Sequence, residues 1–431
     1  MIPSRDAPRH PPRPGQTPAA HQWRTHAAAR PRAAPERPGP LAGIRVVDLS
    51  KILAGPYLTM SLADLGAEVV KVEHPVGGDP TRRWGPPFQG DDATYYLAAN
   101  RNKRSLTLDL TTERGQEAAH RLLARADIAV ENFRPGSSLA RTFAYQELSA
   151  RHPHLVVLHL SAFGEQGPLA GEPGYDMTAQ AAAASCPSPA NPTAPGEGRY
   201  AIGDLGAALF GLAGVTAALV ERARTGRGQY LTTSLYESQL ALHVNWATAH
   251  FATGERPTRL GSGHPSLVPY QAYATADGHL VVAVGNDALF RSLAGALGLP
   301  ALADDPRFTT NSARVTHRDA LNAHLEPLLA TRPTAHWSTL LQGAGVPAAP
   351  VRHLDEVYAS PQTEALGMVQ TVDHPATGGP LRQVAFPVSF QGVRPPVRTA
   401  PPALGEHSAE ILTELGYDEA ESARILGGPG T

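Results

Sequence analysis

Short apolar runs alternate with helical segments through the first half of the chain, and this alternation restricts the fold more than any other feature. The runs that we predict as strands are Ile44–Leu49, Glu68–Val72, Ser105–Leu110, Ile128–Val130 and Leu155–Leu160. Helices are predicted between them, over about 56–65, with Gly66 as its stop, and from Thr111 or Thr112 to about Arg125. Strands that alternate with helices form a mostly parallel sheet with helices on both faces.

Ligands of such α/β sheets bind in the loops that follow the carboxyl ends of the strands. In this chain those loops are Ser50–Ala54, Glu73–Asp79, Asn132–Arg141 and Ser161–Gly167. We therefore look for the functional site there.

The rest of the chain predicts further elements and a second, smaller domain. We expect a helix from Asp204 to about Arg224, a strand over Tyr230–Leu235 and a helix through about Phe251. A hairpin follows with its turn at Ala276–Gly278, then amphipathic helices to about Gln342 and a strand over Val346–Val351. A strand over Pro387–Phe390 and a helix over Ser408–Leu415 complete the prediction.

These elements suggest four parts. Residues 1–40 are rich in Pro, Arg, Ala and His, which predicts a disordered extension. A large domain over 41–255, a small α+β domain over 256–360 and a C-terminal return to the large domain over 361–431 follow.

Composition excludes several classes of function. The net charge of −2 gives no electrostatic reason to expect nucleic acid. No window approaches the roughly 20 uninterrupted apolar residues of a membrane span. The single cysteine, Cys186, allows no disulfide framework, and the histidines lack metal-ligand spacing, so we expect no metal site. We expect a soluble, cytoplasmic enzyme.

One carboxylate stands out, because Gly203-Asp204-Leu205-Gly206 opens onto a long run of small and apolar residues. Asp204 at the entrance of a helix is either an N-cap or a nucleophile. The helix dipole is expected to keep this carboxylate ionised, and amides at the helix start are expected to steady an oxyanion.

Two arginines follow a predicted strand in the loop 132–141. Arg134 and Arg141 either clamp phosphate groups with their guanidinium forks or are solvated surface residues. The sequence pattern alone leaves both readings open.

Several short sequence motifs, taken in order, resemble those of the class III coenzyme A transferases of the CaiB/BaiF type. This family includes formyl-CoA:oxalate and carnitine CoA transferases. The motifs are Leu41-Ala-Gly-Ile-Arg-Val-Val-Asp-Leu-Ser, Ala54-Gly-Pro, Leu65-Gly-Ala-Glu-Val-Val-Lys-Val-Glu, Asn102-Lys-Arg-Ser-Leu, Glu131-Asn-Phe-Arg-Pro-Gly, Gly174-Tyr-Asp, Gly203-Asp and Thr225-Gly-Arg-Gly-Gln. The resemblance covers nearly everything from Leu41 to the C-terminus.

The resemblance implies roles for individual residues. Asp204 matches the nucleophilic aspartate, and Tyr175 lies in a substrate loop. Residues that match CoA contacts are Ile52, Leu53, Ala54, His74, Leu108, Asn132, Phe133, Arg134 and Arg141. Gly261 and Gly263 resemble a flexible glycine segment that covers the active site in the family.

The resemblance also implies a Rossmann-like large domain and a homodimer of two interlocked subunits. The expected substrates are an acyl-CoA donor and a carboxylic acid acceptor, with no tightly bound cofactor. Attack of Asp204 on the thioester would give an aspartyl anhydride, and thiolate attack would then give an aspartyl-CoA thioester.

Three other functions remain open at this point. An α-methylacyl-CoA racemase of the same fold needs an acid–base pair, with histidine where this chain has Tyr175, and a phenol titrates far from neutral pH. A nicotinamide-dependent dehydrogenase fits the opening strand–helix–strand unit, but its first turn lacks GxGxxG. The last is a CoA-binding module without activity.

Overall fold

A computed structural model describes residues 39–185, 200–258, 260–374 and 378–427. The predicted disorder of residues 1–38 and the loop around Cys186 lie outside the described residues. Gly39 and Pro40, which we assigned to the extension, belong to the folded chain, since a Cβ on Gly39 would lie 2.3 Å from the Leu65 carbonyl oxygen. The extension itself stays a prediction.

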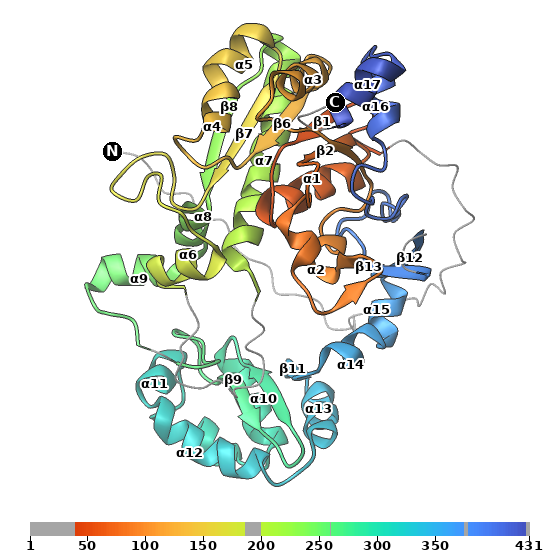
Figure 1. The fold of residues 1–431 in the computed structure, drawn as a ribbon. Helices are drawn as coiled ribbons and strands as arrows, with labels where there is room; N and C mark the ends of the chain where they lie inside the picture. Colours follow the sequence, from red (N-terminus) through yellow and green to blue (C-terminus); the bar gives the residue numbers. More distant parts are fainter. Residues whose placement is uncertain (1–38, 186–199, 259, 375–377, 428–431) are drawn as a thin grey trace, which may run out of the picture. The chain divides into compact units, whose positions relative to one another are not determined.

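Six parallel strands form the main sheet in the order β5-β2-β1-β6-β7-β8, which confirms the α/β prediction (Figure 1). Their bounds are β1 Arg45–Asp48, β2 Glu68–Glu73, β5 Lys103–Thr107, β6 Ile128–Glu131, β7 Val156–Ser161 and β8 Tyr230–Ser234. The chain builds β1, β2 and β5 in one direction and then crosses to β6, β7 and β8. The loops after β1 and β6 therefore adjoin at the reversal point, where ligands bind in open α/β sheets.

Each face of this sheet has its own apolar core. Helices α1 (Ala54–Asp64) and α7 (Ile202–Thr225) pack on one face through residues such as Leu58, Leu62 and Val215. Helices α3 (Glu113–Leu123), α16 (Ser408–Glu414) and α17 (Glu419–Leu426) pack on the other through Leu123, Ile411 and Ile425. The C-terminal helices thus share a core with the first strands.

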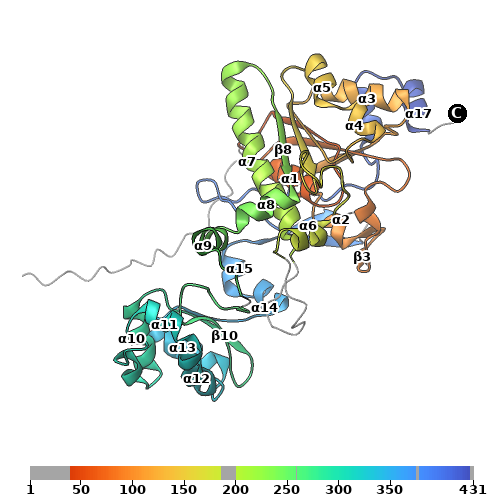
Figure 2. The ribbon, with the colours of Figure 1, turned by 90° about the vertical axis from the view of Figure 1, so that its left-hand side faces the viewer.

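Local sequence explains the helices at these faces. The Thr112 hydroxyl accepts a hydrogen bond from the Gly115 amide at 3.1 Å, as the N-cap of α3 was predicted to do. In α7, Gly211 permits close packing on α1, because a Cβ there would lie 2.7 Å from Leu58 Cδ1. Figure 2 shows α6 (Asp176–Ala182) and α8 (Leu235–Leu242) beside the amino end of α7.

By length and composition, α7 is the one helix among the described residues that could cross a membrane. Such a criterion also selects core helices, and 44% of its most apolar window is buried inside the protein. The packing of α7 on α1 and β7 accounts for its apolar character without a membrane.

Three predictions about single elements were wrong, and two of them concern α8 and β5. The helix expected through Phe251 is divided into α8 and α9 (Asn245–Thr253), because Val244 adopts a φ of +41° that no α-helix accommodates. Strand β5 begins at Lys103 rather than Ser105, and its buried Lys103 side chain pairs with Asp48, so the hydrophobic pattern missed it.

A separate apolar core lies within residues 268–346. The predicted hairpin is present as β9 (Tyr270–Ala274) and β10 (His279–Ala283), and β11 (Ala348–Pro350) adds to it in antiparallel fashion. Its helices are α10 Asp287–Ala296, η2 Pro300–Ala303, α11 Asn311–Thr316, α12 Arg318–Leu329 and α13 Thr334–Gly343. The predicted domain boundaries at 255 and 360 stay predictions.

The strand expected at Pro387–Phe390 was also wrong. Phe390 makes only an isolated bridge to Val393, and the hairpin of this region is formed by β12 (Val369–His374) and β13 (Gly379–Val384). Strand β12 was not predicted because polar residues interrupt its apolar ones, so it contains no continuous apolar run. The remaining elements are η1 Pro80–Arg83, β3 Phe88–Gln89, β4 Asp92–Ala93, α2 Thr94–Leu97, α4 Ser138–Thr142, α5 Tyr145–Arg151, α14 Leu354–Tyr358 and α15 Pro361–Ala365.

Candidate active site

Asp204 lies where two helices begin. It is the third residue of α7 rather than its N-cap, which is Ala201, so the N-cap interpretation was wrong. Its carboxylate accepts a hydrogen bond from the backbone amide of Ala54, the first residue of α1. Leu53, the N-cap of α1, makes no side-chain cap, so Asp204 accepts from an amide that the helix itself leaves free.

The amides at the start of α7 are already occupied. Asp176 Oδ1 accepts hydrogen bonds from the amides of Gly203 at 2.7 Å and Asp204 at 3.2 Å. A side chain at position 203 would collide, since its Cβ would lie 2.6 Å from Gln239 Nε2 and 2.9 Å from Asp176 Oδ1. The expectation that these α7 amides steady an oxyanion was therefore wrong, and the start of α1 is the free helix terminus at Asp204.

The electrostatic environment makes Asp204 a weak acid. Burial raises the pKa of its carboxyl from 3.8 to about 7, the negative charge of Asp176 adds to the rise, and the Ala54 hydrogen bond opposes it. The side chain is 8% exposed. We expected the helix dipole to keep Asp204 ionised at neutral pH, but burial and the charge of Asp176 raise its pKa to about 7, so a protonated fraction remains there.

Aromatic side chains lie beside this pair of carboxylates. Burial raises the pKa of Tyr95 to about 12, with further contributions from the charges of Asp204 and Asp176. The Trp84 ring lies 5.3 Å from the Tyr95 ring and 6.1 Å from the Tyr175 ring. Tyr175 is 63% exposed, so its ring is open to a ligand.

The loop between β1 and α1 is clamped by a residue that we predicted as a CoA contact. Asn132 Oδ1 accepts from the Lys51 amide at 3.0 Å, and Asn132 Nδ2 donates to the Lys51 carbonyl at 2.9 Å. This pair joins the loops after β1 and β6 at the reversal point of the sheet. The Asn132 side chain thereby holds in place the loop that carries Ile52, Leu53 and Ala54.

The other predicted CoA contacts occupy different environments. Leu108 and Phe133 are buried in the core on the α3 face, so their side chains support the site from within. Arg134 and Arg141 are exposed, and Arg141 Nη1 donates to the Gly136 carbonyl at 2.5 Å. His74 Nε2 lies 4.0 Å from Asp109 Oδ1 at the surface.

The predicted glycine segment lies between α9 and β9. Gly261 has a φ of +57°, and the Gly263 amide donates to the Leu260 carbonyl at 2.8 Å. These contacts form a local turn. A role in covering Asp204 stays a prediction.

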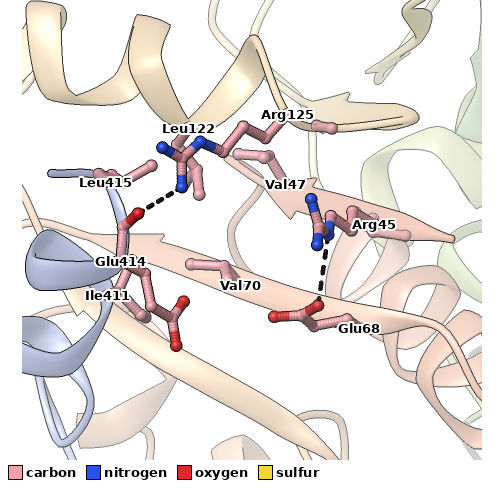
Figure 3. Close-up of a pocket in the computed structure, with 11 residues that line it drawn as sticks. Arg45, Val47, Glu68, Val70, Leu122, Arg125, Ile411, Glu414 and Leu415 are labelled. Carbon is pink, nitrogen blue, oxygen red and sulfur yellow. Dashed lines mark hydrogen bonds and ion pairs between the residues drawn. The ribbon is translucent and has the colours of Figure 1, made fainter. Parts of the chain in front are cut away.

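A cavity of about 440 Å³ lies at the opposite edge of the sheet (Figure 3). Arg45 and Glu68, the first residues of β1 and β2, line it and pair with each other at 3.6 Å. Arg125 donates to the Glu414 carbonyl across it. The cavity lies at the amino ends of β1 and β2, away from the loops in which such sheets bind ligands, so the Asp204 site is the better candidate for chemistry.

Sequence reasoning did not single out Tyr95, which lies beside Asp204, or Asp79 and Lys71, which hydrogen-bond to the backbone of the loop before α1. Asp79 offered one signal, because Asp79-Pro80-Thr81 has the form of a cap followed by proline at the start of a helical turn, which the structure shows as η1.

Among the described residues, no three His, Cys, Asp or Glu side chains gather in a metal-binding arrangement.

Comparison with known proteins identifies the family. The sequence matches CoA-transferase family III over residues 41–408. Succinyl-CoA:glutarate CoA-transferase of Mus musculus is 36% identical over 405 residues, which cover 92% of this chain and 91% of the mouse protein. Acetyl-CoA:oxalate CoA-transferase of Acetobacter aceti is 36% identical over 391 residues, which cover 90% of this chain and 99% of that protein.

A solved structure agrees with these relatives. The crystal structure of a CaiB/BaiF family protein from Brucella suis has a TM-score of 0.76 and 38% identity, and the match covers 88% of this chain and 100% of that chain. The chain belongs to CoA-transferase family III, and it is a CoA-transferase enzyme.

Proposed function

We propose that this enzyme moves CoA from an acyl-CoA to a carboxylic acid through a covalent intermediate on Asp204. The observation that supports this most is the position of the Asp204 carboxylate, which is buried and accepts a hydrogen bond from the first amide of α1. A desolvated carboxylate is a stronger nucleophile than a hydrated one, and the helix start favours negative charge.

The proposed reaction has four steps that balance. The Asp204 carboxylate attacks the thioester carbonyl and expels CoA thiolate, which leaves an acyl-aspartyl anhydride. The thiolate attacks the aspartyl carbonyl, which releases the donor acid and leaves an aspartyl-CoA thioester. The acceptor carboxylate then attacks the aspartyl carbonyl of that thioester, which expels CoA thiolate and forms an anhydride between the acceptor and Asp204. The thiolate finally attacks the acceptor carbonyl of this anhydride, which forms the new CoA thioester and releases the Asp204 carboxylate.

Backbone amides at the start of α1 would stabilise the charge that develops in these steps. The amide of Ala54 already donates to Asp204, so it lies close to the aspartyl carbonyl on which negative charge forms. Asp176 is committed to the α7 amides and fixes the backbone of Asp204.

CoA would bind along the loops after β1 and β6. Arg134 and Arg141 are exposed on the second loop and supply positive charge for phosphates. Ile52, Leu53 and Ala54 would line the pantetheine arm, since they lead to Asp204. His74 would lie near the adenosine end, and Gly261 and Gly263 would cover the site.

The donor and acceptor are proposed to be dicarboxylic. Relatives that share 36–37% identity carry the names succinyl-CoA:glutarate, succinate–glutarate and succinyl-CoA:mesaconate CoA-transferase. We therefore take succinyl-CoA as the first donor to test. A cytoplasmic location and the absence of a tightly bound cofactor, metal, nucleic acid or membrane partner stay predictions.

A homodimer is also proposed, with a surface on α7 and α9 as its contact. Helix α9 has no buried residue in the single chain, although it carries Trp246 and Phe251, and Phe251 is 82% exposed. On α7, Leu209 and Val220 are 55% and 66% exposed. Apolar side chains left open in this way are typical of an interface, and the family resemblance implies that the subunits interlock.

A transfer assay tests the activity. The enzyme is incubated with succinyl-CoA and, in separate reactions, glutarate, oxalate, mesaconate or no acid, and the CoA thioesters are resolved by mass spectrometry. The proposal predicts a new thioester that depends on the acid and is lost in Asp204→Ala. Unaltered transfer by Asp204→Ala would exclude Asp204 as the nucleophile.

A further inference from the structure

The loop that delivers the Ala54 amide to Asp204 contains a strained residue. Ile52 adopts a φ of +75°, in the left-handed region that is unfavourable for β-branched side chains. Such a conformation costs on the order of 1–3 kcal/mol and persists only where surrounding contacts enforce it. It lies two residues before Ala54, so its backbone direction determines where that amide points.

Side chains from the sheet hold this loop at successive residues. Lys71 Nζ donates to the Ser50 carbonyl at 3.0 Å. Asn132 pairs with both backbone groups of Lys51. The Ile52 amide donates to the Asp79 carboxylate, with N–O distances of 3.3 and 3.4 Å. Of these contacts, only that of Asp79 acts on the strained residue itself.

Asp79 is itself rigidly held. It is 1% exposed, pairs with Lys71 Nζ at 3.0 Å, and accepts from the Thr81 amide at 3.0 Å and the Thr81 hydroxyl at 2.7 Å. Burial alone would raise the pKa of Asp79, but Lys71 and the Thr81 hydrogen bonds hold it below its ordinary value. Asp79 is therefore a fixed anion facing the Ile52 amide.

We propose that Asp79 is a positioning residue for Asp204: it holds Ile52 in the left-handed conformation and so directs the Ala54 amide at the nucleophile. Asp79 acts through the backbone of 52–54. The inference rests on the proposed role of Asp204 and adds to it a residue that prepares the site before substrate binds.

Substitution Asp79→Asn removes the charge while it keeps the size of the side chain. A mutation far from the reacting atoms that misplaces a catalytic group by about 1 Å can lower the rate about 100-fold. We expect a fall in kcat of that order. The acid limb of kcat/KM should also move to higher pH, because the Ala54 hydrogen bond lowers the pKa of Asp204.

The direction of this shift separates positioning from simple charge removal. The groups that face Asp204 are Asp176 from α6, Tyr95 from α2 and the Ala54 amide from α1. Asp79 faces Lys71 and Thr81, with Glu73, Asp48 and Lys103 in the same buried network. Loss of an anion near the site would lower the pKa of Asp204, so a shift to lower pH contradicts the proposal.

A second substitution tests the role of strain. Glycine adopts a positive φ without a steric penalty, so Asp79→Asn/Ile52→Gly should recover at least about tenfold of the lost kcat, an activation free energy of about 1.4 kcal/mol. Failure to recover would overturn the proposal. Asp92→Asn is the matched control, since Asp92 is joined to Glu73 of this network through Arg82, which pairs with both carboxylates. This variant should keep near wild-type kcat.

The variants also distinguish the two proposals. Full activity in Asp204→Ala would refute the nucleophile, whereas an inactive Asp204→Ala with a wild-type Asp79→Asn would refute only the positioning role. Thr81→Val removes only the hydroxyl that donates to Asp79, and it should move the acid limb in the same direction by less. If Asp79→Asn does not fold, Thr81→Val provides the test. An acid limb of kcat/KM that stays at the wild-type pH in Thr81→Val would then refute the proposal.

Discussion

Replacement of Asp204 by asparagine should stabilise the protein at alkaline pH while it abolishes transfer. Ionisation of a group with a pKa raised from 3.8 to about 7 opposes folding. At about 1.36 kcal/mol per pH unit, the ionised carboxylate costs about 4 kcal/mol of unfolding free energy. The side chain is 8% exposed, so solvent screening reduces this little.

The sign of the effect follows from the two states. Below pH 3.8 both folded and unfolded chains hold the proton, and Asp204 contributes nothing. Between pH 3.8 and about 7 only the unfolded chain ionises, so wild-type stability falls, and above about 7 the full penalty is present. Asp204→Asn removes a penalty that exists only at higher pH.

Thermal unfolding of both proteins at pH 8 and pH 4 measures this penalty. For a chain of this length, about 4 kcal/mol corresponds to a rise of about 5 °C in Tm at pH 8, and the difference should vanish near pH 4. Asp305→Asn is the control, because Arg307 holds the pKa of Asp305 down to about 2 and its loss should not stabilise the protein. A lower Tm for Asp204→Asn at pH 8 would refute the electrostatic account.

Further outcomes follow from the same site. Wild-type kcat/KM should fall as pH drops through about 7, since the protonated Asp204 carboxyl is a poor nucleophile. Asp176→Asn should shift this fall in kcat/KM to lower pH, because the Asp176 charge raises the pKa of Asp204. An unshifted pH profile would show that another group controls it. Arg141→Ala should weaken CoA binding by about 10- to 100-fold in calorimetry, through loss of a charged hydrogen bond, whereas an equal loss for pantetheine would argue against a phosphate contact.

Much of the fold could be predicted from the sequence because strands and helix starts are determined by residues that are neighbours in the chain. Apolar runs of strand length and cap residues such as Thr112 gave the parallel sheet and α3. The failures came from residues whose conformation depends on partners far along the chain. Lys103 extends β5 because Asp48 neutralises it in the interior. Val244 separates α8 from α9 with a backbone angle that no propensity indicates.

The candidate site was predicted less completely than the fold. The family resemblance pointed to Asp204, but its surroundings depend on tertiary structure. The approach of Asp176 occupies the amides that we had assigned to an oxyanion, and burial reverses the expected shift in the pKa of Asp204. The contact between Asp79 and Ile52 joins residues 27 positions apart, so no local pattern could reveal it.

The most direct measurement of the central claim is chemical trapping of the intermediate on Asp204. The enzyme is mixed with succinyl-CoA without acceptor, quenched with hydroxylamine and digested, and the peptide that contains Asp204 is analysed by tandem mass spectrometry. The account predicts a hydroxamate on Asp204 that requires succinyl-CoA and is absent from Asp204→Asn. An unmodified Asp204 in an enzyme that turns over, or a hydroxamate on another carboxylate, would contradict it.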